Sequence, residues 1–180
     1  MQIERHGIFP TPIWRIPRMD DHPENALSWA LSIKKENEVE RSNRGGGFQS
    51  ESLLSYEEFP YIEHLKKKLV FLPNFAFGNW WVNVNEKGGY NIAHTHPNCD
   101  LSVVWYLTDN RDGLIKFINP TEHTRFNLYN HLNIPNEYEY QCDAGDILVF
   151  PADLMHYVEA NQSNTPRVSV SFNLSLQPYK

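Results

Sequence analysis

Two histidines one residue apart stand in the segment AHTHPNCDLSVVWYL, residues 93 to 107. Side chains two apart on an extended chain point the same way, so His94 and His96 could both face one metal ion. Asp100 follows shortly after them and offers a carboxylate to the same place. The H-x-H pair is a weak signal by itself. With eight histidines in 180 residues, the number of such pairs expected by chance is roughly one third.

A third histidine follows a second strand pattern. The segment GDILVFPADLMH, residues 145 to 156, contains a tight turn, a short apolar run and a proline, and it ends in His156. In a closed β-barrel this segment can bring His156 opposite the H-x-H pair. Three neutral imidazoles, or two imidazoles and a carboxylate, then bind one side of a metal and leave the other side open, as Fe(II) oxygenase chemistry requires. The remaining histidines are predicted at the surface: His6, His22, His64, His123 and His131.

The last predicted strand, residues 167 to 176, carries a second chemical signal. Its odd-numbered side chains are polar and its even-numbered side chains are apolar. A solvent-exposed face explains this alternation, and so does a barrel with a polar interior. In an interior, the permanent charge of Arg167 needs an anionic partner, and its planar fork fits a carboxylate that Ser169 can also contact. At a surface, Arg167 would instead pair with an Asp or Glu.

A strand-rich second half of the chain must position these residues. Its short apolar or alternating segments are separated by Gly, Pro, Asn and Asp clusters, as in a β-sandwich or barrel: NWWVNVN, DLSVVWYL, GLIKFIN, YEYQC, DILVFP and RVSVSFNLSL. The first half predicts helices at about residues 23–35 and 60–71. We expect a mainly β fold with N-terminal helices in one domain, residues 1–180. A mostly helical layer with a glycine-rich loop would span residues 1–75, and the β core residues 76–178.

The composition argues against several classes of protein. Aromatic residues make up 13% of the chain and the net charge is -6, which fits neither a disordered chain nor a partner of nucleic acid or anionic membranes. No stretch approaches the ~20 apolar residues of a membrane span, and the first residues lack a signal-peptide pattern. We therefore expect a cytoplasmic protein with free thiols at Cys99 and Cys142. The oligomeric state stays open, with a homodimer as one candidate.

The motifs in this order resemble the 2-oxoglutarate- and Fe(II)-dependent oxygenases. They are H-x-H, L-S-x-x-x-Y-L, G-D-x-L-x-F-P-x-x-x-x-H and R-V-S-x-S-F-N. A small subgroup from aquatic bacteria and their viruses is the most similar, because its Ser-Asn, glycine-rich, Gln-Ser signature appears at residues 42 to 50, with Phe48 where Trp is usual. The likeness covers roughly residues 8 to 176. It implies a double-stranded β-helix, the barrel that is also called a jelly roll or cupin-like fold.

The resemblance also implies a reaction and a set of site residues. The enzyme would use Fe(II), 2-oxoglutarate and O₂ to hydroxylate a small molecule or peptide, and would form succinate and CO₂. His94 and His156 match the ligand histidines, and His96 stands where the superfamily usually has Asp. Positions that match the 2-oxoglutarate site are Arg167, Ser169, Tyr106, Asn83 and Asn91. The substrate side would be built by loops such as 42–55 and 119–137, with Gly45 to Gly47 as a candidate lid.

Two alternatives remain open at this point. H-x-H-x3-D and G-x5-P-x4-H also resemble the two cupin motifs, which would make Asp100 a ligand in a metalloenzyme that uses no 2-oxoglutarate. A non-catalytic barrel would instead bind a ligand through aromatic residues near its mouth, such as Trp80, Trp81 and Trp105. We favour His96 over Asp100 as the ligand, because His96 holds the superfamily's second-ligand position. Asp100 is then expected to cap the turn into its strand.

Overall fold

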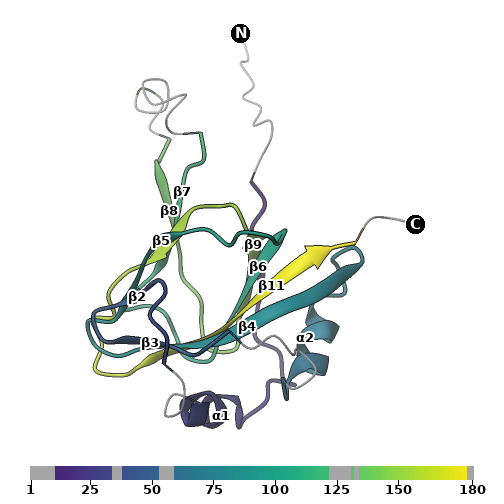
Figure 1. The fold of residues 1–180 in the computed structure, drawn as a ribbon, viewed down its shortest axis with the longest axis horizontal. Coiled ribbons are helices and arrows are strands. Elements are labelled where there is room, and N and C mark those ends of the chain that lie inside the picture. Colours follow the sequence, from purple (N-terminus) through teal and green to yellow (C-terminus); the bar gives the residue numbers. More distant parts are fainter. Residues whose placement is uncertain (1–10, 34–37, 53–58, 122–130, 132–133, 178–180) are drawn as a thin grey trace.

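Two antiparallel sheets pack face to face and form the body of the protein (Figure 1). The computed structural model describes residues 11–33, 38–52, 59–121, 131 and 134–177. The six strands of the major sheet are, in spatial order, β1 (Trp14–Ile16), β9 (Ile147–Pro151), β6 (Leu101–Tyr106), β11 (Arg167–Leu176), β4 (Phe75–Asn85) and β3 (Gly47–Gln49). The five strands of the minor sheet are β2 (Asn43–Arg44), β5 (Tyr90–His94), β10 (His156–Val158), β7 (Ile115–Ile118) and β8 (Glu137–Tyr140). The mainly β fold class predicted from the sequence, a double-stranded β-helix with N-terminal helices, is confirmed.

All six predicted strand segments form strands, but the sequence patterns missed five others. The missed strands have two to five residues each: β1, β2, β3, β5 and β10. Three of them come from the first part of the chain, which therefore contributes edge strands to both sheets as well as helices. Alternation cannot be recognised over two or three residues, so pairing with neighbouring strands decides that the shortest of these segments are extended.

Helices α1 (Ala26–Ile33) and α2 (Ile62–Lys68) cover the outer face of the major sheet (Figure 1). Helix α2 buries Leu65, as its apolar spacing predicts. Helix α1 fully buries Ala26 and Ala30 and leaves its larger apolar side chains partly exposed at the sides of the contact. Small side chains at a contact let the helix axis lie close to the sheet.

The two faces of β11 have different surroundings. Its even-numbered side chains Val168, Val170, Phe172 and Leu174 are buried in the core beneath the helices. Its odd-numbered side chains face the space between the sheets, where Arg167, Ser169 and Ser171 line a cavity. The polar face of this strand is therefore the interior of the barrel, which was one of the two readings that the sequence left open.

A tight turn at the glycine-rich segment joins β2 in the minor sheet to β3 in the major sheet. Gly45 and Gly46 have φ angles of 64° and 87°, in the left-handed region that residues with a side chain rarely adopt. A Cβ atom on Gly45 would also collide with the carbonyl oxygen of Gly88. Strand pairing holds both ends of the turn, so this segment connects the two sheets. Its role as a lid stays a prediction.

Two histidines that were predicted at the surface are half-buried instead. The rings of His22 and His64 each lie 5.5 Å from the ring of Trp105, which is fully buried on the outer face of β6. Burial lowers the pKa of both histidines, so both are neutral at neutral pH. The residues that flank these histidines in the sequence gave no sign of this packing, because Trp105, which covers both histidines, comes from a strand far along the chain.

Several smaller expectations also have an outcome. Cys99 and Cys142 are free thiols, as predicted. His131 is exposed, whereas His6 and His123 lie outside the described residues. No helix in the described ranges is both long and apolar enough to cross a membrane.

Candidate metal centre

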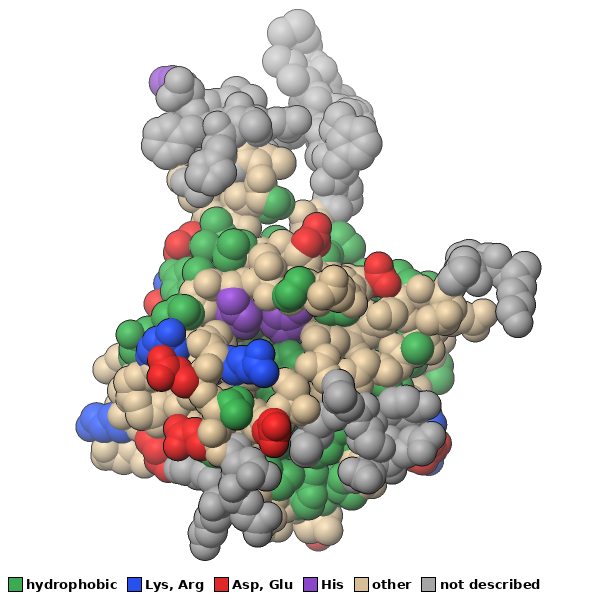
Figure 2. All heavy atoms as spheres, viewed as in Figure 1, with side chains coloured by type: hydrophobic (Ala, Val, Ile, Leu, Met, Phe, Trp, Pro, Cys, Tyr) green, Lys and Arg blue, Asp and Glu red, His purple; other side chains and the backbone are tan. Residues whose placement is uncertain are grey.

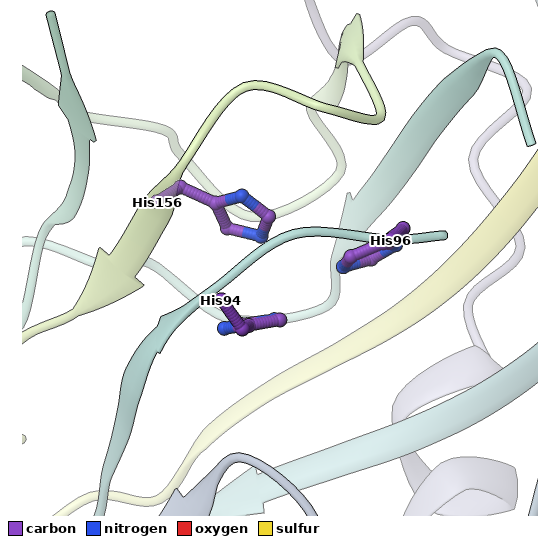
Figure 3. Close-up of side chains that lie close together, drawn as sticks. All are labelled: His94, His96 and His156. Atoms are coloured by element: carbon purple, nitrogen blue, oxygen red, sulfur yellow. The ribbon is translucent and has the colours of Figure 1, made fainter. Parts of the chain in front are cut away.

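Three histidines from neighbouring strands of the minor sheet meet at one point (Figure 3). His94 is the last residue of β5 and His156 is the first residue of β10, and the two are paired across these antiparallel strands. His96 lies two residues beyond β5, where its backbone N–H donates to the carbonyl oxygen of Ala152 over 2.8 Å. One nitrogen of each ring lies within 4.8 Å of the others. The fold thus brings together the residues that the sequence proposed as metal ligands.

Hydrogen bonds fix the tautomer of two of these imidazoles. Nδ1 of His94 lies 2.7 Å from the carbonyl oxygen of Ile92, and Nδ1 of His156 lies 2.8 Å from that of Leu154. A carbonyl oxygen can only accept a hydrogen bond, so each Nδ1 carries the proton and donates it. The lone pair of each Nε2 is therefore free for a metal, and the second nitrogen sets the ring orientation.

His96 is held in the same way by side chains of the major sheet. Its Nδ1 lies 2.8 Å from Oδ1 of Asn173, and the hydroxyl of Ser102 lies 3.1 Å from the same nitrogen. The amide nitrogen of Asn173 donates to Oδ1 of Asn79 over 2.7 Å, which turns the oxygen of Asn173 toward His96. Nδ1 of His96 is then the donor, and its Nε2 is available to complete the ligand set.

Asp100 lies outside this cluster. Among the described residues, the group of side chains close enough to share a metal comprises the three histidines and no carboxylate. The exposed Asp100 accepts a hydrogen bond through Oδ2 from the backbone N–H of Leu176 over 2.7 Å. Asp100 therefore holds the end of β11. The sequence had suggested that it caps the turn into its own strand, and this expectation is wrong. The geometry favours His96 for the third ligand position.

Burial keeps the histidine cluster neutral. Desolvation lowers the pKa of His94, that of His96 to about 4 and that of His156 to about 3. At His96 and His156 the neighbouring imidazoles lower the pKa further, because a second positive charge would be repelled by the first. The neutral imidazole is the form that binds a metal, so metal binding near neutral pH displaces no proton from these rings.

Arg167 is a buried cation without an anionic partner. The residue is only 6% exposed, and its Nη1 donates to the backbone carbonyls of Gly113 and Glu159. The buried Nη2 makes no hydrogen bond with any described residue, and no described carboxylate lies within ion-pair distance. Burial lowers the pKa of this guanidinium to about 10, which still leaves it charged at neutral pH. The alternative of a surface ion pair is therefore wrong, and the free N–H points to an anion that the chain itself does not supply.

One cavity between the sheets contains both Arg167 and the histidines. The cosubstrate residues that the resemblance implied all line it: Arg167, Ser169, Tyr106, Asn83 and Asn91. Tyr106 is completely buried, and burial raises the pKa of its hydroxyl, so the phenol stays neutral. The cavity wall also includes apolar side chains, Val104, Ile115 and Val158. The interior therefore combines donors for an anion with a wall that limits access of water.

The two asparagines of the cavity belong to a small polar network. Asn83 donates to the hydroxyl of Ser171 over 3.1 Å. Asn91 donates to the hydroxyl of Ser42 over 3.0 Å and accepts a hydrogen bond from Asn85 over 2.9 Å. These bonds hold the polar wall in one arrangement, because each partner is itself buried or partly buried.

Sequence reasoning missed several residues of the cavity wall, although a signal for them existed. The odd-numbered residues of β4 face inward like those of β11, and the register pairs Ser169 with Asn83 and Ser171 with Trp81. Extending the alternation of the last strand to its neighbour would have found Asn85 as well.

The aromatic residues expected near the mouth divide between the two faces of the sheet. The ring of Trp81 lies 5.3 Å from that of His96 and lines the cavity. Trp80 and Trp105 lie on the outer face, in the core beneath the helices. The expectation is thus wrong for these two, because neighbouring residues of a strand point to opposite faces.

Comparison with known proteins agrees with this arrangement. Residues 79–173 match the protein family described as "Putative 2OG-Fe(II) oxygenase". No curated protein matches the sequence of the chain.

Solved structures with a similar fold include those of three proteins. The non-heme alpha ketoglutarate dependent carbocyclase SnoK from nogalamycin biosynthesis has a TM-score of 0.67 at 16% identity, over 92% of this chain and 80% of SnoK. The alpha ketoglutarate dependent epimerase SnoN from the same biosynthesis has a TM-score of 0.66 at 16% identity, over 92% and 77%. HygX from Streptomyces hygroscopicus, solved with nickel and 2-oxoglutarate bound, has a TM-score of 0.66 at 12% identity, over 94% and 85%. At such identities the likeness concerns the fold.

Proposed function

This chain belongs to the 2OG-Fe(II) oxygenase family, and we propose that it hydroxylates a small molecule or peptide with Fe(II), 2-oxoglutarate and O₂. The observation that carries the proposal is the unpaired Nη2 of buried Arg167, in the same cavity as three histidines with free Nε2 atoms. A buried cation that lacks a partner is costly unless an anion completes it. 2-Oxoglutarate would bring that anion to the cavity.

In this proposal each group of side chains has one task. His94, His96 and His156 would hold Fe(II) through Nε2. Arg167 and Ser169 would bind the distal carboxylate of 2-oxoglutarate, as a charge-assisted and a neutral hydrogen-bond donor. The bound iron and 2-oxoglutarate supply the activation of O₂ and an oxidative decarboxylation that yields succinate and CO₂.

The charge of the site fits a dianionic cosubstrate. Neutral imidazoles leave both positive charges of Fe(II) uncompensated, one more than a site with an aspartate ligand would leave. Arg167 adds a third positive charge to the cavity, and the described lining residues include no carboxylate. Because charges are weakly screened in a buried site, a dianion is strongly favoured there. Tyr106 and Asn83 would add neutral hydrogen bonds.

Anaerobic titration of 2-oxoglutarate tests the proposal. The wild-type protein, loaded with Fe(II), is expected to bind 2-oxoglutarate and, after O₂ is admitted, to form succinate slowly without a substrate. Arg167→Ala should weaken 2-oxoglutarate binding by about 100-fold, as expected for the loss of a buried charge-assisted contact of about 2–3 kcal/mol. Arg111→Ala is the matched control, because this exposed arginine pairs with Asp143 outside the cavity.

Two results would contradict the proposal: wild-type protein that binds no 2-oxoglutarate, or Arg167→Ala that binds it equally well. If the wild-type protein binds no 2-oxoglutarate but retains a metal, a cupin-type metalloenzyme is favoured. If it binds neither 2-oxoglutarate nor a metal, a ligand-binding barrel is favoured.

The finer expectations also belong to the proposal. They are the subgroup from aquatic bacteria and their viruses, one domain, a cytoplasmic location, a candidate homodimer and the absence of nucleic-acid or membrane partners. The glycine-rich signature supports the subgroup, and the net charge of -6 supports the absence of nucleic-acid and anionic-membrane partners.

A further inference from the structure

A second hollow, which we call the mouth pocket, opens beside the histidine cluster. It shares Ser42, Trp81, His94 and His96 with the interior cavity but does not include Arg167. Figure 2 shows histidine side chains at the surface of this face with a Lys or Arg side chain close by. The mouth pocket has a volume of about 300 Å³, in the range of small-molecule sites. Its other polar side chains include Arg41, Gln49, Asn79 and Thr95.

Gln49 is a mostly buried residue whose side chain lines the mouth pocket. It is the last residue of β3, where it pairs with Asn83 of β4, and its neighbour Phe48 packs into the outer core. This alternation turns Gln49 inward, and the residue is 5% exposed. Its side chain lines the mouth pocket, and none of the hydrogen bonds among the described residues uses it. An amide in this position is free to donate to and accept from a bound molecule.

Arg41 and Asn79 add donors to the mouth pocket. Arg41 is exposed and bonds to neighbouring residues through its backbone, and its guanidinium makes no ion pair with a described residue. Oδ1 of Asn79 accepts from Asn173, and its amide nitrogen makes no hydrogen bond with a described residue. The described lining contains one cation and no carboxylate. The pocket therefore offers unpaired donors, one of them charged, beside the metal ligands.

We propose that the mouth pocket binds the substrate to be oxidised, and that this substrate is a small polar molecule with a carboxylate or phosphate group for Arg41 and an amide-like group for Gln49. This inference rests on the proposed function, because it takes the histidine cluster as the oxidising centre. Four residues line both chambers: Ser42, Trp81, His94 and His96. The proposal places the cosubstrate with Arg167 on one side of them and the substrate with Arg41 on the other.

Capped amino acid amides test the charge preference, since they share one backbone and differ in the side chain. The probes are the N-acetyl amides of glutamate, phosphoserine, glutamine and lysine. Each is titrated by calorimetry, without O₂, into protein that already holds Fe(II) and 2-oxoglutarate. The wild type should bind at least one of the two anionic probes about tenfold more tightly than the glutamine and lysine probes. The tighter of the two anionic probes identifies carboxylate or phosphate as the group.

Variants separate the two contacts. Arg41→Gln should remove the preference for the anionic probes, and Arg41→Lys should restore most of it. Gln49→Leu, which keeps the size of the side chain, should weaken the glutamate, phosphoserine and glutamine probes together. Lys87→Gln removes one exposed charge outside the mouth pocket and should change nothing.

The inference is overturned if the wild type binds neither anionic probe more tightly than the glutamine probe. A preference that survives Arg41→Gln also overturns it. The preceding 2-oxoglutarate titration reports on the proposed function separately. If that titration fails, the oxygenase assignment is wrong; if it succeeds and the probes show no charge preference, only the substrate class is wrong.

Discussion

The outer and inner faces of the major sheet are built from alternate residues of the same strands. Even-numbered residues of β4 and β11, such as Val82 and Phe172, form an apolar core with the helices. Odd-numbered residues, such as Asn85 and Arg167, line the cavity and leave hydrogen-bonding groups unpaired. The outer face stabilises the fold, and this allows the inner face to keep polar groups that contribute little to stability. Substitutions on the outer face should therefore mainly reduce stability, and substitutions on the inner face should mainly reduce ligand binding.

The largest effect on stability is expected from the outer face. Phe172→Ala should lower the free energy of unfolding by about 3–5 kcal/mol, since the ring packs 4.9 Å from that of Phe59 and is fully buried. Ser169→Ala, on the inner face of the same strand, is the matched control and should cost about 1 kcal/mol or less, because its hydroxyl makes no hydrogen bond with a described residue. Urea titration of both variants measures the difference. Equal losses would mean that the two faces do not differ as described.

The largest effect on ligand binding is expected from the inner face. Loss of a residue that only hydrogen-bonds to a metal ligand typically reduces metal affinity by about 10–100-fold. His156→Ala removes a ligand itself, so it should reduce Fe(II) affinity by more than this and should change the free energy of unfolding little. Metal analysis after equilibrium dialysis measures the loss. Asp100→Ala is the control and should retain the metal, because its carboxylate bonds to the backbone of Leu176. Loss of metal from Asp100→Ala would instead favour the cupin-type ligand set.

A smaller effect on the metal is expected from the residue that orients His96. Asn173→Leu removes the acceptor of the His96 Nδ1–H group and should reduce Fe(II) affinity by about 10–100-fold. Leu174→Ala, one residue along β11 on the outer face, should reduce stability and leave Fe(II) affinity unchanged. Fe(II) titrations of both variants at a temperature where both are folded separate the two outcomes. Unchanged affinity in Asn173→Leu would show that Ser102 alone orients the ring.

The smallest effect is expected from pH, through the half-buried histidines of the outer face. Burial lowers the pKa of His22 and His64 in the folded state, so the unfolded chain binds protons first as the pH falls below about 6.5. Their stabilising contribution is therefore present above about pH 6.5 and is lost as the pH falls toward their folded-state pKa values, by less than about 1.4 kcal/mol per pH unit for each group. Replacing both with Phe should flatten the acid side of the stability curve, measured by urea titrations between pH 5 and 7. A curve that stays as steep would assign the acid sensitivity to the inner histidine cluster alone.

The sequence by itself determined the parts of the protein that depend on local patterns. Alternation over ten residues identified β11 and divided its side chains into two faces, because side chains of a strand alternate whatever surrounds them. The motif order also placed the three histidines and Arg167 in one proposed site, and the fold brings them into one cavity.

Only the tertiary structure decided which polar residues face a ligand. Whether the polar face of β11 meets water or a cavity depends on the minor sheet that covers it, and this sheet includes strands of two to five residues that no local pattern indicates. Likewise, Asp100 and His96 are both near His94 in the chain, but the backbone of Leu176 binds the carboxylate and Asn173 orients the imidazole. These partners are distant in sequence, so the choice between the two side chains follows from packing and not from spacing.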